Sequence, residues 1–249
     1  MSESRETAAV KPEIEGKRET EHLPTGCPAL AAIVIGRRDP KTDGWLIREV
    51  TMAVHYGDRV GIVGSSGAGK TVLLRALAML DPIDAGEILW NGRPVRGDTV
   101  PAFRKQVIYL HQRPALYEGS VEDNLRYPFT LKGHRSNAFD RSRVVDLLAA
   151  LGRDAGFLAK SSRDLSGGEA QIVALIRAIQ LEPSVLLLDE PTASLDPRTG
   201  QALEVVIDRW LSAKTGERAL IWVSHDREQT LRMTAQTIAL HSGRVVMEQ

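Results

Sequence analysis

The sequence has little cysteine, no net charge and no long apolar run. Its single cysteine, Cys27, excludes an internal disulfide, so a disulfide-stabilised scaffold is ruled out. Lys plus Arg and Asp plus Glu number 32 each, so the basic excess typical of nucleic-acid-binding proteins is missing. Apolar runs such as 29–35 are far shorter than the roughly 18 residues that a membrane-spanning helix requires. We therefore expect no nucleic-acid partner and no transmembrane segment in this chain.

The first part of the 249-residue chain differs in composition from the rest. Residues 1–25 contain six Glu and four Lys or Arg, interspersed with two prolines and one glycine. A segment with so little apolar surface cannot offset the entropy that it would lose on ordering. We expect a disordered polar tail over 1–26 and one folded domain over 27–249.

From residue 27 onward, short apolar runs alternate with longer stretches of helical periodicity. Val, Ile and Leu runs with little polar alternation predict strands that are buried on both faces of a mostly parallel sheet. These runs are 31–36, 49–55, 58–63, 106–110, 184–188, 219–223 and 237–240. Between them, 120–180 predicts helices near 121–125, 142–151 and 168–181. The pattern favours an α/β fold with a helical insertion.

A glycine-rich turn follows the strand predicted at 58–63 and precedes a helix predicted at 71–80. Its glycines allow successive backbone N–H groups to turn inward around phosphate oxygens, at the positive end of a helix. Lys70 would reach the β- and γ-phosphates, and the Thr71 hydroxyl would bind Mg²⁺. The predicted nucleotide-binding residues are Gly64, Ser65, Ser66, Gly67, Ala68, Gly69, Lys70, Thr71 and Val72.

This phosphate loop alone fits a GTPase, a small-molecule kinase or a transport ATPase. A GTPase would carry an Asn-Lys-x-Asp motif after a later strand, and the sequence has none. The apolar run 185–188 ends in Asp189 and Glu190, two carboxylates at a strand end. Asp189 suits the role of holding Mg²⁺, and Glu190 is placed to polarise an attacking water as general base.

The segment 165–169 reads Leu-Ser-Gly-Gly-Glu and lies between the two motifs above. Taken alone it fits an ordinary helix start, with Ser166 and Glu169 forming a capping box. In its position it resembles the Leu-Ser-Gly-Gly-Gln signature of the ABC ATPase family. The residues of this signature are Leu165, Ser166, Gly167, Gly168 and Glu169.

The resemblance covers about 29–249 and assigns further residues. Gln112 matches the Q-loop glutamine, and His225 matches the switch histidine that contacts the γ-phosphate. The D-loop residues would be Ser194, Leu195 and Asp196. The catalytic residues would be Glu190, His225, Lys70 and Gln112. The residues that bind Mg²⁺ would be Thr71, Gln112 and Asp189.

The family fold that this implies is a P-loop NTPase with a RecA-like core over 27–113 and 180–249. It would have an N-terminal antiparallel β portion and a helical subdomain over 114–179. The resemblance also implies ATP and Mg²⁺ as cofactors and a head-to-tail homodimer, in which the signature of one chain completes the site of the other. The chain would act on the cytoplasmic face of the inner (plasma) membrane, on a separate permease.

The sequence departs from the family where an aromatic residue usually stacks on adenine. The equivalent segment 36–39 reads Gly-Arg-Arg-Asp and has no aromatic side chain. Arg37, Arg38 or Trp45 would have to stack on the base instead. Weak stacking predicts loose discrimination between ATP and GTP.

The transported substrate is indicated only by the segment 115–129, which lies where the family docks its membrane subunit. It is similar to stand-alone ATPases assigned to iron or metal export, and shares an Asp-Asn pair with phosphate-importer ATPases. Import and export both stay open on this evidence. A further alternative is a soluble ABC-type ATPase of an assembly machine, such as the iron–sulfur cluster scaffold.

Overall fold

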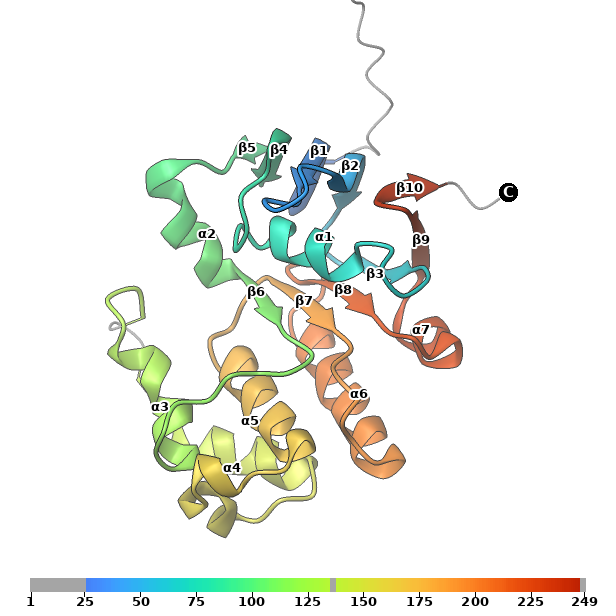
Figure 1. The fold of residues 1–249 in the computed structure, drawn as a ribbon. Helices are drawn as coiled ribbons and strands as arrows, with labels where there is room; N and C mark the ends of the chain where they lie inside the picture. Colours follow the sequence, from blue (N-terminus) through green and yellow to red (C-terminus); the bar gives the residue numbers. More distant parts are fainter. Residues whose placement is uncertain (1–25, 135–137, 247–249) are drawn as a thin grey trace, which may run out of the picture.

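The computed structural model describes residues 26–134 and 138–246, so the tail expected over 1–26 lies almost wholly outside the described residues (Figure 1). The strands are β1 (Leu30–Arg38), β2 (Trp45–Val54), β3 (Arg59–Val63), β4 (Ala85–Trp90), β5 (Arg93–Pro94), β6 (Val107–Leu110), β7 (Val185–Asp189), β8 (Ala219–Val223), β9 (Gln236–His241) and β10 (Arg244–Val246). The helices are α1 (Lys70–Leu77), α2 (Val100–Gln106), α3 (Val121–Thr130), α4 (Arg141–Ala150), α5 (Gly167–Ile179), α6 (Pro197–Ser212) and α7 (Arg227–Met233).

The strands form two sheets. The smaller one is antiparallel, with the order β2-β1-β4-β5. The larger one has the order β10-β9-β3-β8-β7-β6, and in it only β10 runs antiparallel to its neighbour. This arrangement confirms the predicted fold class, a mostly parallel core with an antiparallel β portion near the N-terminus.

The larger sheet separates two hydrophobic cores because its central strands are buried on both faces. In β7, Val185 and Leu187 pack into the core shared with α1 and the antiparallel sheet. Their neighbours Leu186 and Leu188 pack into the core shared with α5 and α6. Figure 1 shows α1 between the two sheets, and α5 and α6 below the larger one. Such two-sided burial is what the unbroken apolar runs predict.

The helices α3, α4 and α5 lie together beyond the larger sheet, in the part of the chain where the sequence predicts only helices (Figure 1). Val121 and Leu125 of α3, Leu148 of α4 and Ile172 of α5 are fully buried in one core with β7 and β8. Helices α3 and α4 pack on α5, which in turn packs against the sheet. Among the helices of the described residues, none is both long and apolar enough to cross a membrane.

Several elements were not predicted from the sequence. Strand β4 begins Ala-Gly-Glu, which lacks the apolar run used to predict the other strands, yet it pairs with β1 from Leu30 to Gly36. Helix α6 was also missed, although its first residue is Pro197 and Asp196 caps it by accepting from the Thr199 N–H at 3.0 Å. Proline at the first helical position after an Asp cap is a usual helix start.

Candidate functional site

The predicted site residues lie at the carboxyl ends of neighbouring parallel strands. The phosphate loop follows β3, Asp189 ends β7, and Glu190 follows it. Gln112 follows β6, and His225 follows β8. Because β8 lies between β3 and β7, and β6 lies beside β7, all four strand ends meet at one edge of the sheet. Ligands of open α/β sheets bind at this edge.

The phosphate loop closes around its own lysine. The Lys70 ammonium donates to the backbone oxygens of Gly64 and Ser65, at 2.8 and 3.0 Å. Gly64 has a φ of +151°, and a Cβ at this position would lie 2.2 Å from the Leu240 carbonyl oxygen. Only glycine therefore allows the loop to pass this close to β9. The loop leads directly into α1, whose N-terminus favours an anion.

Two hydroxyl groups bind the same oxygen of Asp189. Thr71 Oγ1 donates to Asp189 Oδ2 at 2.8 Å, and the Tyr109 hydroxyl donates to the same atom at 2.9 Å. Asp189 is only 2% exposed. Burial, together with the nearby Asp189 charge, raises the pKa of the Tyr109 phenol far above its usual range. Tyr109 therefore stays a hydrogen-bond donor to this carboxylate.

Glu190 is held from two sides. Gln112 Nε2 donates to Glu190 Oε2 at 2.8 Å, and His225 Nε2 lies 2.6 Å from Glu190 Oε1. Glu190 also has a φ of +49°, which is uncommon for a residue with a side chain. Its N–H donates to the Val223 carbonyl at 2.9 Å, which ties this backbone to β8. Strained backbone of this kind is typical of functional sites.

The segment 165–169 starts α5 and contacts the predicted D-loop. Ser166 Oγ accepts from the Glu169 N–H at 3.2 Å, and Glu169 Oε2 accepts from the Ser166 N–H at 2.9 Å, so the capping box is present. A hydrogen bond from Lys160 holds the pKa of the Glu169 carboxyl below its usual range. A Cβ on Gly168 would lie 2.6 Å from the Ser194 carbonyl oxygen, so a larger residue would separate the two segments.

The structure thus brings the predicted residues together in two groups. Thr71, Asp189, Gln112, Glu190 and His225 form one group of direct contacts around the phosphate loop. The signature and the D-loop form the other. Within the described residues, no hydrogen bond or ion pair joins 165–169 to 64–72.

Sequence reasoning missed Tyr109, which touches the predicted metal carboxylate. Its signal was present, since Tyr109 is the only polar side chain in the strand Val-Ile-Tyr-Leu of β6. Pairing of Tyr109 with Leu187 in β7 sets it two residues before Asp189 on the next strand. That register is a tertiary feature that the sequence pattern does not contain.

The three candidates for adenine stacking differ in how free their side chains are to contact a base. Arg37 forms an ion pair with Asp81 at 2.7 Å and is largely buried. Arg38 lies over the Trp45 ring, with its guanidinium carbon 4.5 Å from the ring centroid. Trp45 is 36% exposed. The carbonyl of the adjacent Leu46 lies 2.9 Å from the point where a Cβ on Gly69 would stand, so the backbone next to Trp45 borders the phosphate loop.

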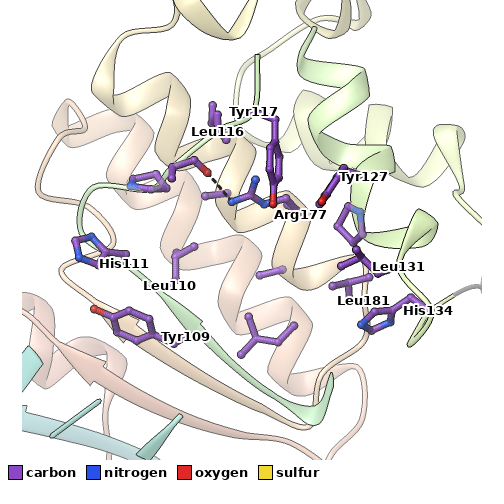
Figure 2. Close-up of a pocket in the computed structure, with 16 residues that line it drawn as sticks. Tyr109, Leu110, His111, Leu116, Tyr117, Tyr127, Leu131, His134, Arg177 and Leu181 are labelled. Carbon is purple, nitrogen blue, oxygen red and sulfur yellow. Dashed lines mark hydrogen bonds between the residues drawn. The ribbon is translucent and has the colours of Figure 1, made fainter. Parts of the chain in front are cut away.

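A groove of about 530 Å³ lies between the segment after β6 and the helices α3 and α5. Figure 2 shows Tyr109 and His111 at one end of it, and Leu131 and His134 at the other. The Tyr117 and Tyr127 rings lie with their centroids 4.0 Å apart. Both rings are exposed, which is unusual for side chains of this size.

Arg177 of α5 fixes the shape of this groove. Its guanidinium donates to the Ala115 carbonyl at 3.0 Å, which ties the segment after β6 to α5 (Figure 2). Burial lowers the pKa of this guanidinium, although the side chain keeps its charge. The groove therefore combines an apolar lining with a fixed cation.

Comparison with known proteins identifies the family of this chain. Residues 47–193 match the family described as ABC transporter, which is more than half of the chain. The chain belongs to the ABC transporter family. It is an ATP-binding subunit of the kind found in that family, and an ATPase.

Relatives of this ABC protein include two whose names state different cargoes. It is 36% identical over 234 residues to Protein STAR1 of Oryza sativa subsp. japonica, covering 94% of this chain and 66% of that protein. It is 35% identical to Phosphate import ATP-binding protein PstB 2 of Natronomonas pharaonis, with 82% and 75% covered. It is 32% identical to Probable iron export ATP-binding protein FetA of Escherichia coli (strain K12), with 75% and 81% covered.

A solved structure shares the fold of this ABC protein. It is the dimeric ATP-binding cassette MJ0796 in a post-hydrolysis state, bound to ADP and Pi. The TM-score is 0.78 at 23% identity, over 88% of this chain and 97% of that chain. At this TM-score and coverage, the two chains share a fold.

Proposed function

We propose that this ABC protein hydrolyses ATP at the strand ends described above and thereby powers a separate membrane permease. The observation that carries the proposal is the double contact on Glu190. Gln112 and His225 each hold one of its oxygens, beside a phosphate loop and a buried Asp189. A carboxylate fixed in this way can orient and polarise a water for attack on a phosphate.

The phosphate loop binds the nucleotide in this proposal. Backbone N–H groups of 64–69 and the N-terminus of α1 cradle the β-phosphate, and Lys70 moves from the loop carbonyls to the phosphate oxygens. This exchange is favourable because a phosphate accepts stronger hydrogen bonds than a neutral carbonyl. Trp45 stacks on the base from the edge of the loop.

The residues beside the loop fit Mg²⁺. Within the described residues, no group of three or more His, Cys, Asp or Glu could hold a metal by itself. Thr71 Oγ1 and Asp189 Oδ2 lie 2.8 Å apart and offer the hard oxygen donors that Mg²⁺ prefers, together with phosphate oxygens and water. When bound, the ion would neutralise charge on the phosphates. Gln112 is the third proposed ligand, from the end of β6.

Glu190 is the proposed general base. Its carboxylate accepts a proton from the attacking water as the bond between the γ-phosphorus and the bridging oxygen breaks, so that the phosphoryl group passes to the water and ADP leaves. His225 lies on the side of Glu190 opposite Gln112 and would donate to the γ-phosphate. These two residues hold Glu190 in place, so that little reorganisation is needed during the reaction.

The signature acts in a second copy of the chain. In a head-to-tail homodimer, Ser166 and Gly168 of one chain would bind the γ-phosphate held by the other chain's phosphate loop. This is supported by the separation of 165–169 from 64–72 within one chain, and by the dimeric state of the MJ0796 cassette. The contact between Gly168 and Ser194 would move the D-loop together with the signature.

The groove beside α3 and α5 is the proposed docking site for the permease. Its lining includes residues on both sides of Gln112 in the chain, His111 and Pro114, so an occupant would lie close to the residue that contacts Glu190. The ATPase would accordingly work on the cytoplasmic face of the inner (plasma) membrane.

For the cargo, we favour export of iron or another metal, on the resemblance of segment 115–129 and the relation to FetA. The relation to PstB 2 supports the alternative, import of phosphate or another small solute. Co-purification separates these from an assembly role: a polytopic membrane protein supports transport, whereas a soluble scaffold protein supports assembly.

The substitution Glu190→Gln tests the catalytic assignment. It keeps the shape of the side chain and one of its two acceptor oxygens but removes the base. We expect ATP binding to be retained, turnover to fall by about 10²- to 10⁴-fold, and an ATP-bound dimer to accumulate on size exclusion. The exposed Glu217→Gln is the matched control. Near-normal hydrolysis by Glu190→Gln would overturn the assignment.

A further inference from the structure

Tyr109 is the one residue of this site that neither the motifs nor the proposed mechanism uses. Its hydroxyl lies 2.9 Å from Asp189 Oδ2, the oxygen that Thr71 also contacts. We propose that Tyr109 is a positioning residue that orients the metal-binding carboxylate of Asp189. This inference rests on the proposed function, in which Asp189 holds Mg²⁺.

Such a residue is needed because Thr71 has two roles: it donates to Asp189, and it is a proposed ligand of the metal. In the structure, Thr71 and Tyr109 both donate to one oxygen of a buried carboxylate. When Thr71 turns a lone pair toward a metal, its hydrogen bond to Asp189 changes. The bond from Tyr109 does not depend on the metal, so it fixes the carboxylate rotamer in both states. Hydrogen bonds to metal-binding carboxylates commonly tune affinity in this way.

The backbone makes Tyr109 a rigid donor. Strands β6 and β7 are adjacent and parallel, with Tyr109 opposite Leu187 and Leu110 opposite Leu188. The Tyr109 side chain therefore reaches forward along its neighbour strand to the end where Asp189 lies. The His111 ring meets the Tyr109 ring edge-on, at 5.9 Å between centroids and an interplanar angle of 87°. The ring is thus held by His111 just beyond the end of β6 as well as by the sheet.

The Tyr109 side chain lies on the α1 face of the larger sheet. It packs against the core that contains Leu187, whereas the next residue, Leu110, packs into the core shared with α5. Its hydroxyl therefore meets the same Asp189 oxygen that Thr71, at the start of α1, contacts. The hydrogen bond to the metal-binding carboxylate is thus made from the α1 side of the sheet.

The test is the substitution Tyr109→Phe, which removes the hydroxyl and keeps the ring. Mn²⁺ serves as a spectroscopic replacement for Mg²⁺, and its binding to the ATP-loaded Glu190→Gln background is followed by electron paramagnetic resonance. We expect Tyr109→Phe to weaken Mn²⁺ binding about ten-fold. ATP binding in EDTA, measured by equilibrium dialysis, should stay unchanged because no metal is then held.

The matched control is Tyr56→Phe. Its hydroxyl donates to Asn91 Oδ1 at 2.8 Å, so this variant also loses one tyrosine hydrogen bond, but at the turn between β2 and β3. We expect its Mn²⁺ affinity to equal that of the parent. If Tyr109→Phe does not fold, Tyr109→Met supplies a second side chain of similar bulk without a hydroxyl.

The outcomes separate this inference from the proposed function. Unchanged Mn²⁺ affinity in Tyr109→Phe, with a large loss in Asp189→Asn, would overturn the role of Tyr109 alone. Equal weakening of ATP binding with and without metal would mean a merely structural role and would also overturn it. Unchanged Mn²⁺ affinity in Asp189→Asn would overturn the proposed metal site itself.

Discussion

The imidazole Nε2 of His225 lies 2.6 Å from Oε1 of Glu190, across the ends of two neighbouring parallel strands. The two residues are brought together by the pairing of β7 with β8, in which Asp189 lies opposite Val223. The His225 side chain is more than half exposed, whereas Glu190 is mostly buried. A solvent-facing side chain thus caps a mostly buried carboxylate.

Removal of this cap should slow the chemical step more than nucleotide binding. We expect His225→Ala to lower ATP turnover by about 100-fold, because Glu190 loses one of its two orienting contacts. The affinity for ATP should change by less than about three-fold, since Lys70 and the loop are intact. Steady-state kinetics and a binding titration measure both quantities. His55→Asn, in the turn before β3, is the control, and normal turnover of His225→Ala would contradict the assigned role.

Mixing two inactive variants tests whether the site is shared between chains. Lys70→Ala disables the phosphate loop, and Ser166→Arg disables the signature. Each variant alone should be inactive, but a mixture should recover about a quarter of the wild-type rate. Half of randomly paired dimers are mixed, and each of these has one intact site of two. If mixing restores no activity, the phosphate loop and the signature of the same chain form one site, and the shared-site proposal is wrong.

Loss of the Ser166 cap is also expected to cost about 1 kcal/mol of stability. A thermal melt of Ser166→Arg before mixing therefore shows whether enough folded protein is present for the comparison.

Base recognition should depend on Trp45. We expect Trp45→Ala to weaken ATP binding about ten-fold, because one base–aromatic stacking contact is lost. Trp45→Phe should recover most of the affinity. Wild-type protein should bind GTP within about ten-fold of ATP, since stacking does not read the edge of the base. Equal ATP affinity in Trp45→Ala and wild type would exclude this side chain as the platform.

The carboxylate of Glu182 should make stability depend on pH. It contacts Arg143 and Arg218, and Lys214 lies 3.3 Å away. Burial alone raises the pKa of Glu182, but these cations outweigh it and hold the pKa below its usual range. A lowered pKa in the folded state means that the stabilisation is full above the unfolded-state pKa. It is lost as the pH falls through the folded-state pKa.

We expect Glu182→Gln to lower the free energy of unfolding by about 1–3 kcal/mol at neutral pH, with the difference vanishing in strong acid. The loss is sizeable because Arg218 is only 3% exposed, and it is moderated because Glu182 is 31% exposed. Denaturant titrations at several pH values measure it. Glu118→Gln breaks a fully exposed pair with Arg163 and should cost less than about 1 kcal/mol. A pH-independent difference would contradict the ionic origin.

Strands and the phosphate loop could be predicted because their signals are local. The run 58–63 followed by a Gly-rich turn and a helix corresponds to β3, the loop and α1. The unbroken Val, Ile and Leu runs identify β7 and β8 because both faces of these strands are buried. Strand β4 escaped prediction because its burial depends on pairing with β1 rather than on its own composition.

The contacts of the site could not be predicted, because they are made between segments far apart in the chain. Gln112 and Glu190 are 78 positions apart, and Thr71 and Asp189 are 118 apart. The motif order suggests that these residues share a site, but only the strand order puts their side chains within hydrogen-bonding distance. The roles assigned to them stay predictions until the variants above are measured.

The alternation of β7 between two cores gives the protein a built-in pair of probes. Leu187 and Leu188 are consecutive residues, and both lie just before Asp189. The methyl groups of Leu187 report on the layer of α1, whereas those of Leu188 report on the layer of α5 and α6. In a methyl-labelled sample, their resonances would therefore show separately how each half of the molecule responds to a nucleotide. The methyl resonances of two adjacent leucines can thus report separately on the two sides of one sheet.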